Sequence, residues 1–113
     1  MYKTILHPTD LSETHFHLAE KAAHFAQKMG AKIYLLHVIE PPASLQIAQS
    51  LGFAEFDMPR KEDAQSVMNV LGDALSIPEE QQFVEIGSVK VHVIETVHKL
   101  NCDLVIIGSK EPD

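Results

Sequence analysis

Apolar residues form two kinds of pattern along the chain, short and largely apolar runs and longer stretches with helical spacing. The short runs lie before Pro8 and at 32–38, 82–86 and 104–107, and a Pro or Gly follows each one. Runs of this length that end at turn residues are typical of strands covered on both faces of a sheet. The pattern therefore predicts four strands.

Three of the stretches between these runs have helical spacing. The first begins after Ser12, a good N-cap residue, and ends at Gly30, where a left-handed C-cap costs least. The second begins at Arg60 and the third begins after Ser88, another N-cap candidate. Apolar residues recur at intervals of three and four, which places them on one helical face. The expected inward-facing residues are Phe16, Ala19, Ala22, Ala23, Ala26 and Met29, then Ala64, Val67, Met68, Leu71 and Leu75, then Val93, Ile94, Val97 and Leu100.

The stretch 43–59 has a mixed pattern. Apolar residues between Leu45 and Leu51 allow a short helix, whereas Gly52 and Pro59 favour irregular structure. Elsewhere strand and helix alternate, with connections long enough for right-handed crossovers between parallel strands. The sequence thus predicts an α/β fold, an open parallel sheet with helices on its faces.

Composition and charge narrow the classes of function. With 113 residues, 45% hydrophobic and 22% charged, residues 1–113 are expected to form a single soluble domain. No apolar run suits a membrane helix or a signal peptide, and the lone Cys102 suits a reducing compartment, so we expect a cytoplasmic protein without a membrane partner. Lys and Arg number 9 against 16 Asp and Glu, and the net charge of −7 argues against nucleic-acid binding.

Candidates for metal binding or catalysis are few. His7 and His37 end neighbouring strands and would suit a metal pair, but zinc sites need three or four ligands and no further ligands occur at metal-binding spacing. The chain has no Gly-x-Gly-x-x-Gly motif, no Walker A motif and no Gly-x-Ser-x-Gly elbow. We therefore predict no metal, no catalytic residue and no enzymatic activity.

Several motifs occur together at regular places in the chain. They are Ile5-Leu-His-Pro-Thr-Asp-Leu-Ser12, Gly30-Ala-Lys, Leu35-Leu-His-Val38, Gly87 before a helix, and Asp103-Leu-Val-Ile-Ile-Gly-Ser109. In this order they resemble the universal stress protein family over essentially the whole chain. The resemblance implies a Rossmann-like, adenine nucleotide alpha hydrolase-like sheet with strand order 3-2-1-4, the usual fifth strand being absent from this chain. It also implies a homodimer.

The resemblance further implies a candidate nucleotide site, because the family contains members that bind ATP and members that do not. ATP binders hold the adenine with the loop after the first strand and a Val ending the second, and the phosphates with a Gly-x-x-Gly motif and a later Gly-Ser or Gly-Thr. Here Glu111 occupies the place of the second Gly, where its carboxylate would repel a polyphosphate. The later pair and its helix are expected to be missing from this chain. The matching residues are Pro8, Thr9, Asp10, Val38, Gly108 and Ser109.

Two functional hypotheses follow from this resemblance. In the first, the protein is a cytoplasmic stress-response regulator that acts as a dimer, through unknown protein partners, with weak or no ATP binding. In the alternative, ATP or AMP still binds and is slowly hydrolysed. Asp10 bears on both, because its carboxylate would either accept a hydrogen bond from an adenine amino group or cap the first helix beside Ser12. A third hypothesis is that the chain is a fragment of a longer domain.

Overall fold

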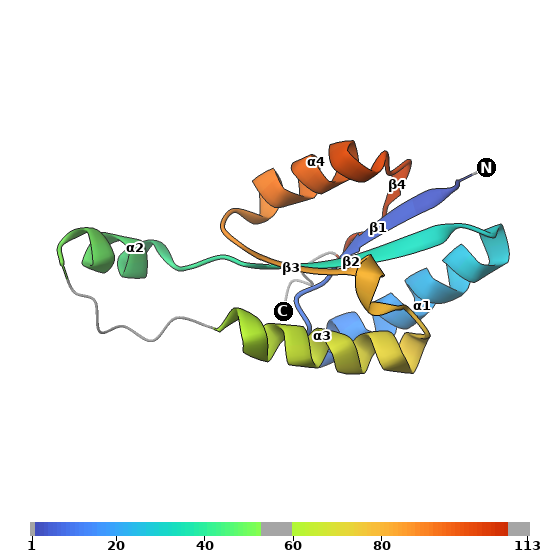
Figure 1. The fold of residues 1–113 in the computed structure, drawn as a ribbon, viewed down its shortest axis with the longest axis horizontal. Coiled ribbons are helices and arrows are strands. Elements are labelled where there is room, and N and C mark those ends of the chain that lie inside the picture. Colours follow the sequence, from blue (N-terminus) through green and yellow to red (C-terminus); the bar gives the residue numbers. More distant parts are fainter. Residues whose placement is uncertain (1, 53–59, 109–113) are drawn as a thin grey trace.

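A parallel sheet with strand order β3-β2-β1-β4 forms the centre of the computed structural model, which describes residues 2–52 and 60–108 (Figure 1). This confirms the predicted α/β fold and its strand order. The third strand has the predicted bounds, and the second extends one residue further than predicted. The strands are β1 (Thr4–Pro8), β2 (Lys32–Ile39), β3 (Gln82–Ile86) and β4 (Leu104–Val105).

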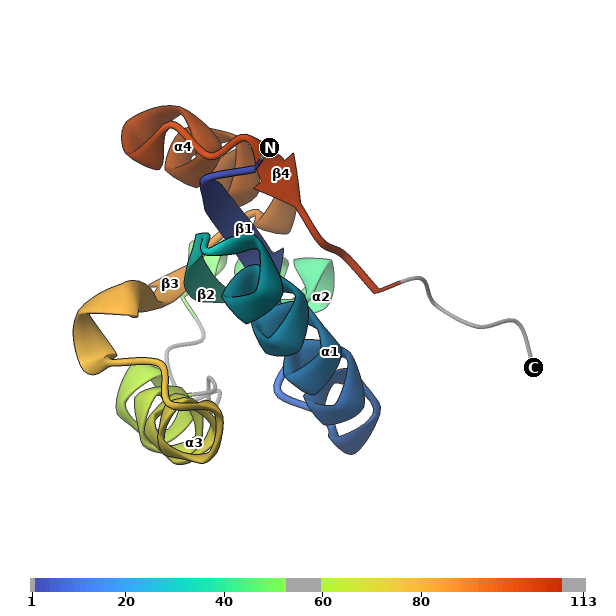
Figure 2. The ribbon, with the colours of Figure 1, turned by 90° about the vertical axis from the view of Figure 1, so that its right-hand side faces the viewer.

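Helices cover both faces of this sheet. Because the chain moves from β1 outward to β3 and then returns past β1 to β4, right-handed crossovers place α1 and α3 on one face and α4 on the other (Figure 2). No helix in the described ranges is both long and apolar enough to cross a membrane. The helices are α1 (Glu13–Met29), α2 (Ala43–Ser50), α3 (Lys61–Leu75) and α4 (Val89–Leu100), with a short 3-10 turn, η1 (Glu79–Gln81).

Two apolar layers form the core, one on each face of the sheet. Alternation along β1 sends Ile5 toward α1 and α3 and Leu6 toward α4, and both side chains are fully buried. The small residues predicted for the inward face of α1 let that helix approach the sheet closely. The larger layer holds Ile5, Ala19, Ala22, Ala26, Ile33, Leu35, Ile39, Met68, Leu71, Ile77 and Val84, and the smaller one holds Leu6, Leu36 and Val38.

The helix ends follow the sequence signals. The hydroxyl of Ser12 accepts a hydrogen bond from the backbone N–H of His15, and Gly30 ends α1 with φ of 66°. Ser88 caps α4 in the same way, and Asn101 ends it in the left-handed conformation. These contacts confirm the predicted caps at Ser12, Gly30 and Ser88.

The fourth strand is shorter than predicted, because 104–107 was expected and the ladder ends at Val105. The backbone N–H of Ile106 still donates to the carbonyl of Leu6 at 2.9 Å. In a parallel ladder the carbonyl of Ile106 would next accept from Pro8, which has no N–H. The ring of His7 donates to that carbonyl instead, at 2.7 Å, and Ile107 beyond it is 68% exposed.

Two residues of the predicted helix faces also lie differently. Val67 of α3 and Ile94 of α4 were expected to face inward, but they are 49% and 48% exposed. Each lies at the border of its apolar stripe.

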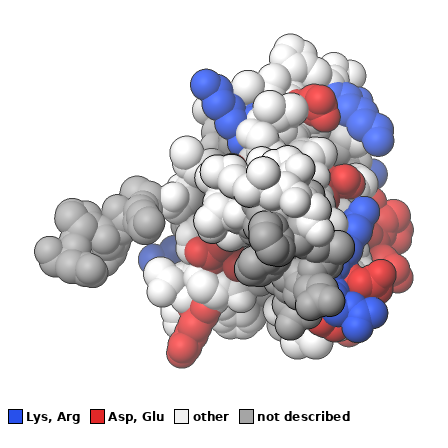
Figure 3. Space-filling model, turned by 90° about the vertical axis from the view of Figure 1, so that its left-hand side faces the viewer, with Lys and Arg blue, Asp and Glu red and all other residues white. Residues whose placement is uncertain are grey.

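The mixed stretch 43–59 contains one helix, α2, and its residues 53–59 lie outside the described part of the chain. This helix projects from the carboxyl end of β2, away from the sheet (Figure 1). It has no charged residue, and Ile47 is 59% exposed. The space-filling view from this end is accordingly white at its centre (Figure 3).

Candidate functional site

A pocket of about 290 Å³ lies at the carboxyl ends of β1 and β2. All the predicted nucleotide-binding residues that the structure describes line it, whereas Ser109, like Glu111, lies outside the described residues. A larger cavity, between the C-terminal halves of α1 and α3, has none of them. The residues lining the smaller pocket are Pro8, Thr9, Asp10, His15, Leu36, Val38, Val89, Ile107 and Gly108.

The walls of the pocket are mostly apolar, and its polar groups come from the turn between β1 and α1. Leu36 and Val38 from β2 and Val89 from α4 supply much of the apolar wall. Sites for small ligands commonly combine such walls with a few placed polar groups, in volumes of about 300 to 1,000 Å³. At about 290 Å³ the pocket lies at the lower end of this range.

The turn after β1 is held by side-chain hydrogen bonds to its own backbone. The buried Thr9 accepts from the N–H of Leu11 at 3.1 Å, and its own N–H donates to the carbonyl of Leu36 at 2.8 Å. Asp10 Oδ1 accepts from the N–H of Ser12 at 2.8 Å. Leu11 accordingly adopts a φ of 62°, in the left-handed region. Such turns fix the backbone before a helix begins, so the pocket wall is preformed.

Asp10 thus makes the local contact beside Ser12 that was one of its two predicted roles. Its side chain is 58% exposed, and Asp10 also lines the pocket. Partial burial on its own would raise the pKa of Asp10, but the hydrogen bonds from Ser12 and the nearby His15 and His37 outweigh it and hold the pKa below its usual value. The group is therefore an anionic hydrogen-bond acceptor at neutral pH.

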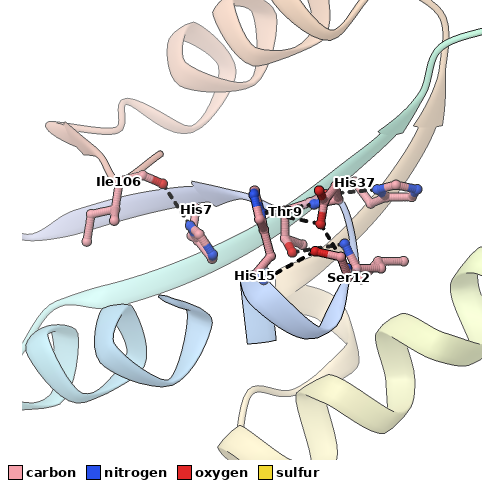
Figure 4. Close-up of polar contacts among 8 residues, drawn as sticks. His7, Thr9, Ser12, His15, His37 and Ile106 are labelled. Carbon is pink, nitrogen blue, oxygen red and sulfur yellow. Dashed lines mark hydrogen bonds and ion pairs between the residues drawn. The ribbon is translucent and has the colours of Figure 1, made fainter. Parts of the chain in front are cut away.

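The rings of His7 and His37 each hydrogen-bond to a backbone carbonyl. Nδ1 of His7 donates to the carbonyl of Ile106 at 2.7 Å, and Nδ1 of His37 donates to the carbonyl of Thr9 at 2.8 Å (Figure 4). Within residues 2–52 and 60–108, no three His, Cys, Asp or Glu side chains come together as metal ligands. These two rings instead tie the end of β1 to its neighbours.

Four pocket residues were missed by the sequence reasoning: His15, Leu36, Val89 and Ile107. Leu36 and Ile107 belong to apolar runs that predict only strand interior, and Val89 follows a helix cap. His15 could have been suspected from its position. It is a polar residue in the first turn of the helix that follows a strand, and such a residue points back toward the end of that strand. That signal is weak without the geometry of the turn.

We expect stability to fall as the pH decreases from 7.5 to 5.5, because His7 is fully buried and its Nε2 has no hydrogen-bond partner. Burial lowers the pKa of His7 most, the Ile106 carbonyl raises it, and His15 lowers it further. The unfolded chain, with a His pKa of about 6.5, therefore binds a proton before the folded chain does. Neutral His7 therefore makes its full contribution to the free energy of unfolding above about pH 6.5. Below that pH the contribution falls by at most about 1.4 kcal/mol per pH unit.

Urea unfolding at three pH values tests this expectation. The non-titrating His7→Asn variant, which keeps a donor near Ile106, is expected to lose most of this slope. His24→Gln, at an exposed position of α1, is the matched control and is expected to keep it. Equal slopes in wild type and His7→Asn would show that the pH dependence arises elsewhere.

Comparison with known proteins agrees with this fold. The model of the universal stress protein family matches residues 1–112. Universal stress protein G of Escherichia coli O157:H7 is 32% identical over 118 residues, covering 99% of this chain and 82% of that protein. Universal stress protein UspA from Lactobacillus plantarum has a similar structure, with a TM-score of 0.70 and 20% identity over 99% of this chain and 80% of that one. A universal stress protein in complex with cAMP gives a TM-score of 0.64 and 14% identity, over 92% of this chain and 70% of that one. This chain belongs to the universal stress protein family.

Proposed function

We propose that this protein is a regulatory binding protein of the stress response that acts in the cytoplasm as a homodimer, with weak or no ATP binding. In this proposal residues 1–113 are one domain, and the protein acts through partner contacts rather than through catalysis. The observation that supports it is the charge of the pocket. Asp10 is ionised at neutral pH, and none of the described lining residues is Lys or Arg.

That charge works against a triphosphate. A polyphosphate beside an ionised carboxylate is repelled unless cations compensate, and the repulsion is strongest where water is partly excluded. The net charge of −7 adds a repulsive field around the whole molecule. An uncharged or weakly charged ligand avoids both the repulsion from Asp10 and the repulsion from the net charge, so the pocket favours a nucleoside over ATP.

Sedimentation velocity with and without ATP tests the regulatory proposal. We expect a concentration-dependent dimer whose dissociation constant does not change when ATP is added. A monomer at all concentrations would contradict the dimer. A dimer that tightens with ATP would show that nucleotide and assembly are coupled, which is the opposite of what we propose.

Adenine-nucleotide binding is the second candidate function, and one observation favours it. The described residues of the predicted site, far apart in the sequence, meet around a single pocket. One protein with a similar fold was solved in complex with cAMP. In this proposal AMP or ATP is the ligand, and any hydrolysis is slow.

Asp10→Ala is expected to weaken AMP binding about tenfold, because it removes the acceptor for the adenine amino group, a hydrogen bond to a charged group. Isothermal titration calorimetry measures this loss directly. Asp73→Ala, at an exposed position in α3 away from the pocket, is the matched control and is expected to bind as wild type does. Unchanged affinity in Asp10→Ala would remove Asp10 from the site.

A further inference from the structure

His15 brings a second polar side chain to the pocket, next to Asp10. It lies in the first turn of α1 and reaches back to the turn after β1, with 22% of its side chain exposed (Figure 4). Its Nδ1 accepts a hydrogen bond from the backbone N–H of Asp10 at 3.3 Å. Because Nδ1 is the acceptor, this hydrogen bond assigns the proton of the neutral ring to Nε2.

The same Nδ1 lies 3.5 Å from Oδ1 of Asp10, and this contact would be an ion pair only with a protonated ring. The two contacts exclude each other, since a protonated Nδ1 cannot accept from the Asp10 N–H. The backbone bond is the shorter contact and needs no added proton. With Nδ1 as its acceptor, Nε2 carries the ring hydrogen and is a hydrogen-bond donor.

Nε2 of His15 lies next to Gly108, and both residues line the pocket. A Cβ placed on Gly108 would lie 3.0 Å from this nitrogen and 2.9 Å from Cδ2 of Leu18. The absence of a side chain at Gly108 thus leaves the Nε2 edge of the imidazole uncrowded at the pocket. His15 and Gly108 both line it, so the N–H is placed where a bound ligand would meet it.

An acceptor and a donor therefore lie side by side at one edge of an apolar slot. The acceptor is the ionised carboxylate of Asp10, and the donor is the Nε2–H of His15. Adenine offers the complementary pair, an amino group beside a ring nitrogen, whereas hypoxanthine has a carbonyl oxygen in place of the amino group. A carbonyl oxygen at that place would face the carboxylate without a hydrogen between them.

We propose that His15 is a specificity-determining residue of this pocket, which donates from Nε2 to a ring nitrogen of adenine while Asp10 accepts from the neighbouring amino group. The proposal rests on the nucleotide-binding function proposed above and names its ligand class, a 6-aminopurine nucleoside. Leu36, Val38 and Val89 then contact the faces of the flat base. His15 adds the ring-nitrogen contact that a carboxylate cannot make.

Calorimetric titration of the 113-residue chain with adenosine and with inosine is the first test. We expect adenosine to bind at least about tenfold more tightly, since inosine loses one hydrogen bond and gains a repulsive contact. Of 1-deazaadenosine and 7-deazaadenosine, one is expected to bind about tenfold more weakly than adenosine, because it lacks the accepting nitrogen.

Two variants separate the role of the ring as a donor to the ligand from its role in holding Asp10. His15→Gln places an N–H near the position of Nε2, and His15→Asn places an acceptor near Nδ1 without the distal donor. We expect His15→Gln to bind adenosine within about threefold of wild type and His15→Asn to lose about tenfold. The affected deaza analogue is expected to lose nothing further in His15→Asn. Thermal unfolding of each variant checks that the fold is kept.

The opposite order, with His15→Asn unchanged and His15→Gln weakened, would overturn the proposal and leave His15 as a support for Asp10. Equal affinity of adenosine in wild type and both variants would also overturn it, while nucleotide binding itself would stand. If wild type binds neither adenosine nor inosine nor AMP, this proposal and the nucleotide-binding function fall together.

Discussion

Gly72→Ala is expected to lower the free energy of unfolding by about 2 to 3 kcal/mol, although Ala is the better helix former by about 1 kcal/mol. Gly72 lies in the last turn of α3 and is buried against β3. A Cβ at this position would overlap Nε2 of Gln82 and would lie 2.8 Å from both Cδ of Gln82 and the carbonyl oxygen of Ile77. The backbone carbonyl cannot move without shifting the loop that leads to β3.

Gly72→Ala is expected to cost more than steric overpacking alone, because it also disturbs Gln82. Its side-chain amide is buried and donates to the carbonyl of Ile77 at 3.0 Å, and its Oε1 already lacks a partner. Displacing this side chain would leave a buried carbonyl unpaired, which costs about 1 to 3 kcal/mol. The absence of a side chain at Gly72 therefore allows α3 to pack directly against Gln82 of β3.

Urea unfolding of Gly72→Ala, of Gln82→Ala and of the double variant measures the coupling. Because Gln82→Ala removes the overlapping atoms, we expect the Gly72→Ala cost to be smaller in that background by about 1 kcal/mol or more. Additive costs would show that the two residues do not contact each other as described.

Leu35→Ala is expected to lower the free energy of unfolding by about 3 to 4 kcal/mol, more than Gly72→Ala does. Leu35 lies on β2, is fully buried, and packs in the layer between the sheet and α1 and α3. The surrounding residues come from several elements, so the site cannot collapse to fill the space, and a cavity term adds to the lost transfer free energy.

Leu51→Ala is the matched control, because the same atoms are removed from a side chain that is 70% exposed. We expect it to change the free energy of unfolding by less than about 0.5 kcal/mol. Equal effects at the two positions in urea unfolding would contradict the assignment of the core.

Much of the fold could be predicted because each element has its own local signal. The spacing of Ala19, Ala22 and Ala26 and the caps at Ser12 and Gly30 depend on residues close in the chain. The end of β4 could not be predicted, because it depends on Pro8 lacking an N–H opposite Ile106, a register that only the assembled sheet fixes. The contact between Gly72 and Gln82 is of the same tertiary kind.

The residues of the candidate site also fall into two groups, those that could be predicted from the sequence and those that depend on the folded structure. Asp10 and Gly108 were predicted because they match the nucleotide site that the family resemblance implies, and both follow strand ends, which a parallel sheet brings together. His15 was missed because it enters the pocket from a helix, through a turn in which Leu11 adopts a positive φ. The sequence does not reveal that backbone conformation, since few residues other than Gly adopt it.

Calorimetric titration of the purified chain with ATP and with AMP, at one salt concentration, tests the central claim most directly. If the pocket holds an adenine nucleoside and has no described cation for a polyphosphate, AMP should bind at least as tightly as ATP. ATP binding much more tightly than AMP would contradict the account, because it would require a phosphate site that outweighs the charge of Asp10.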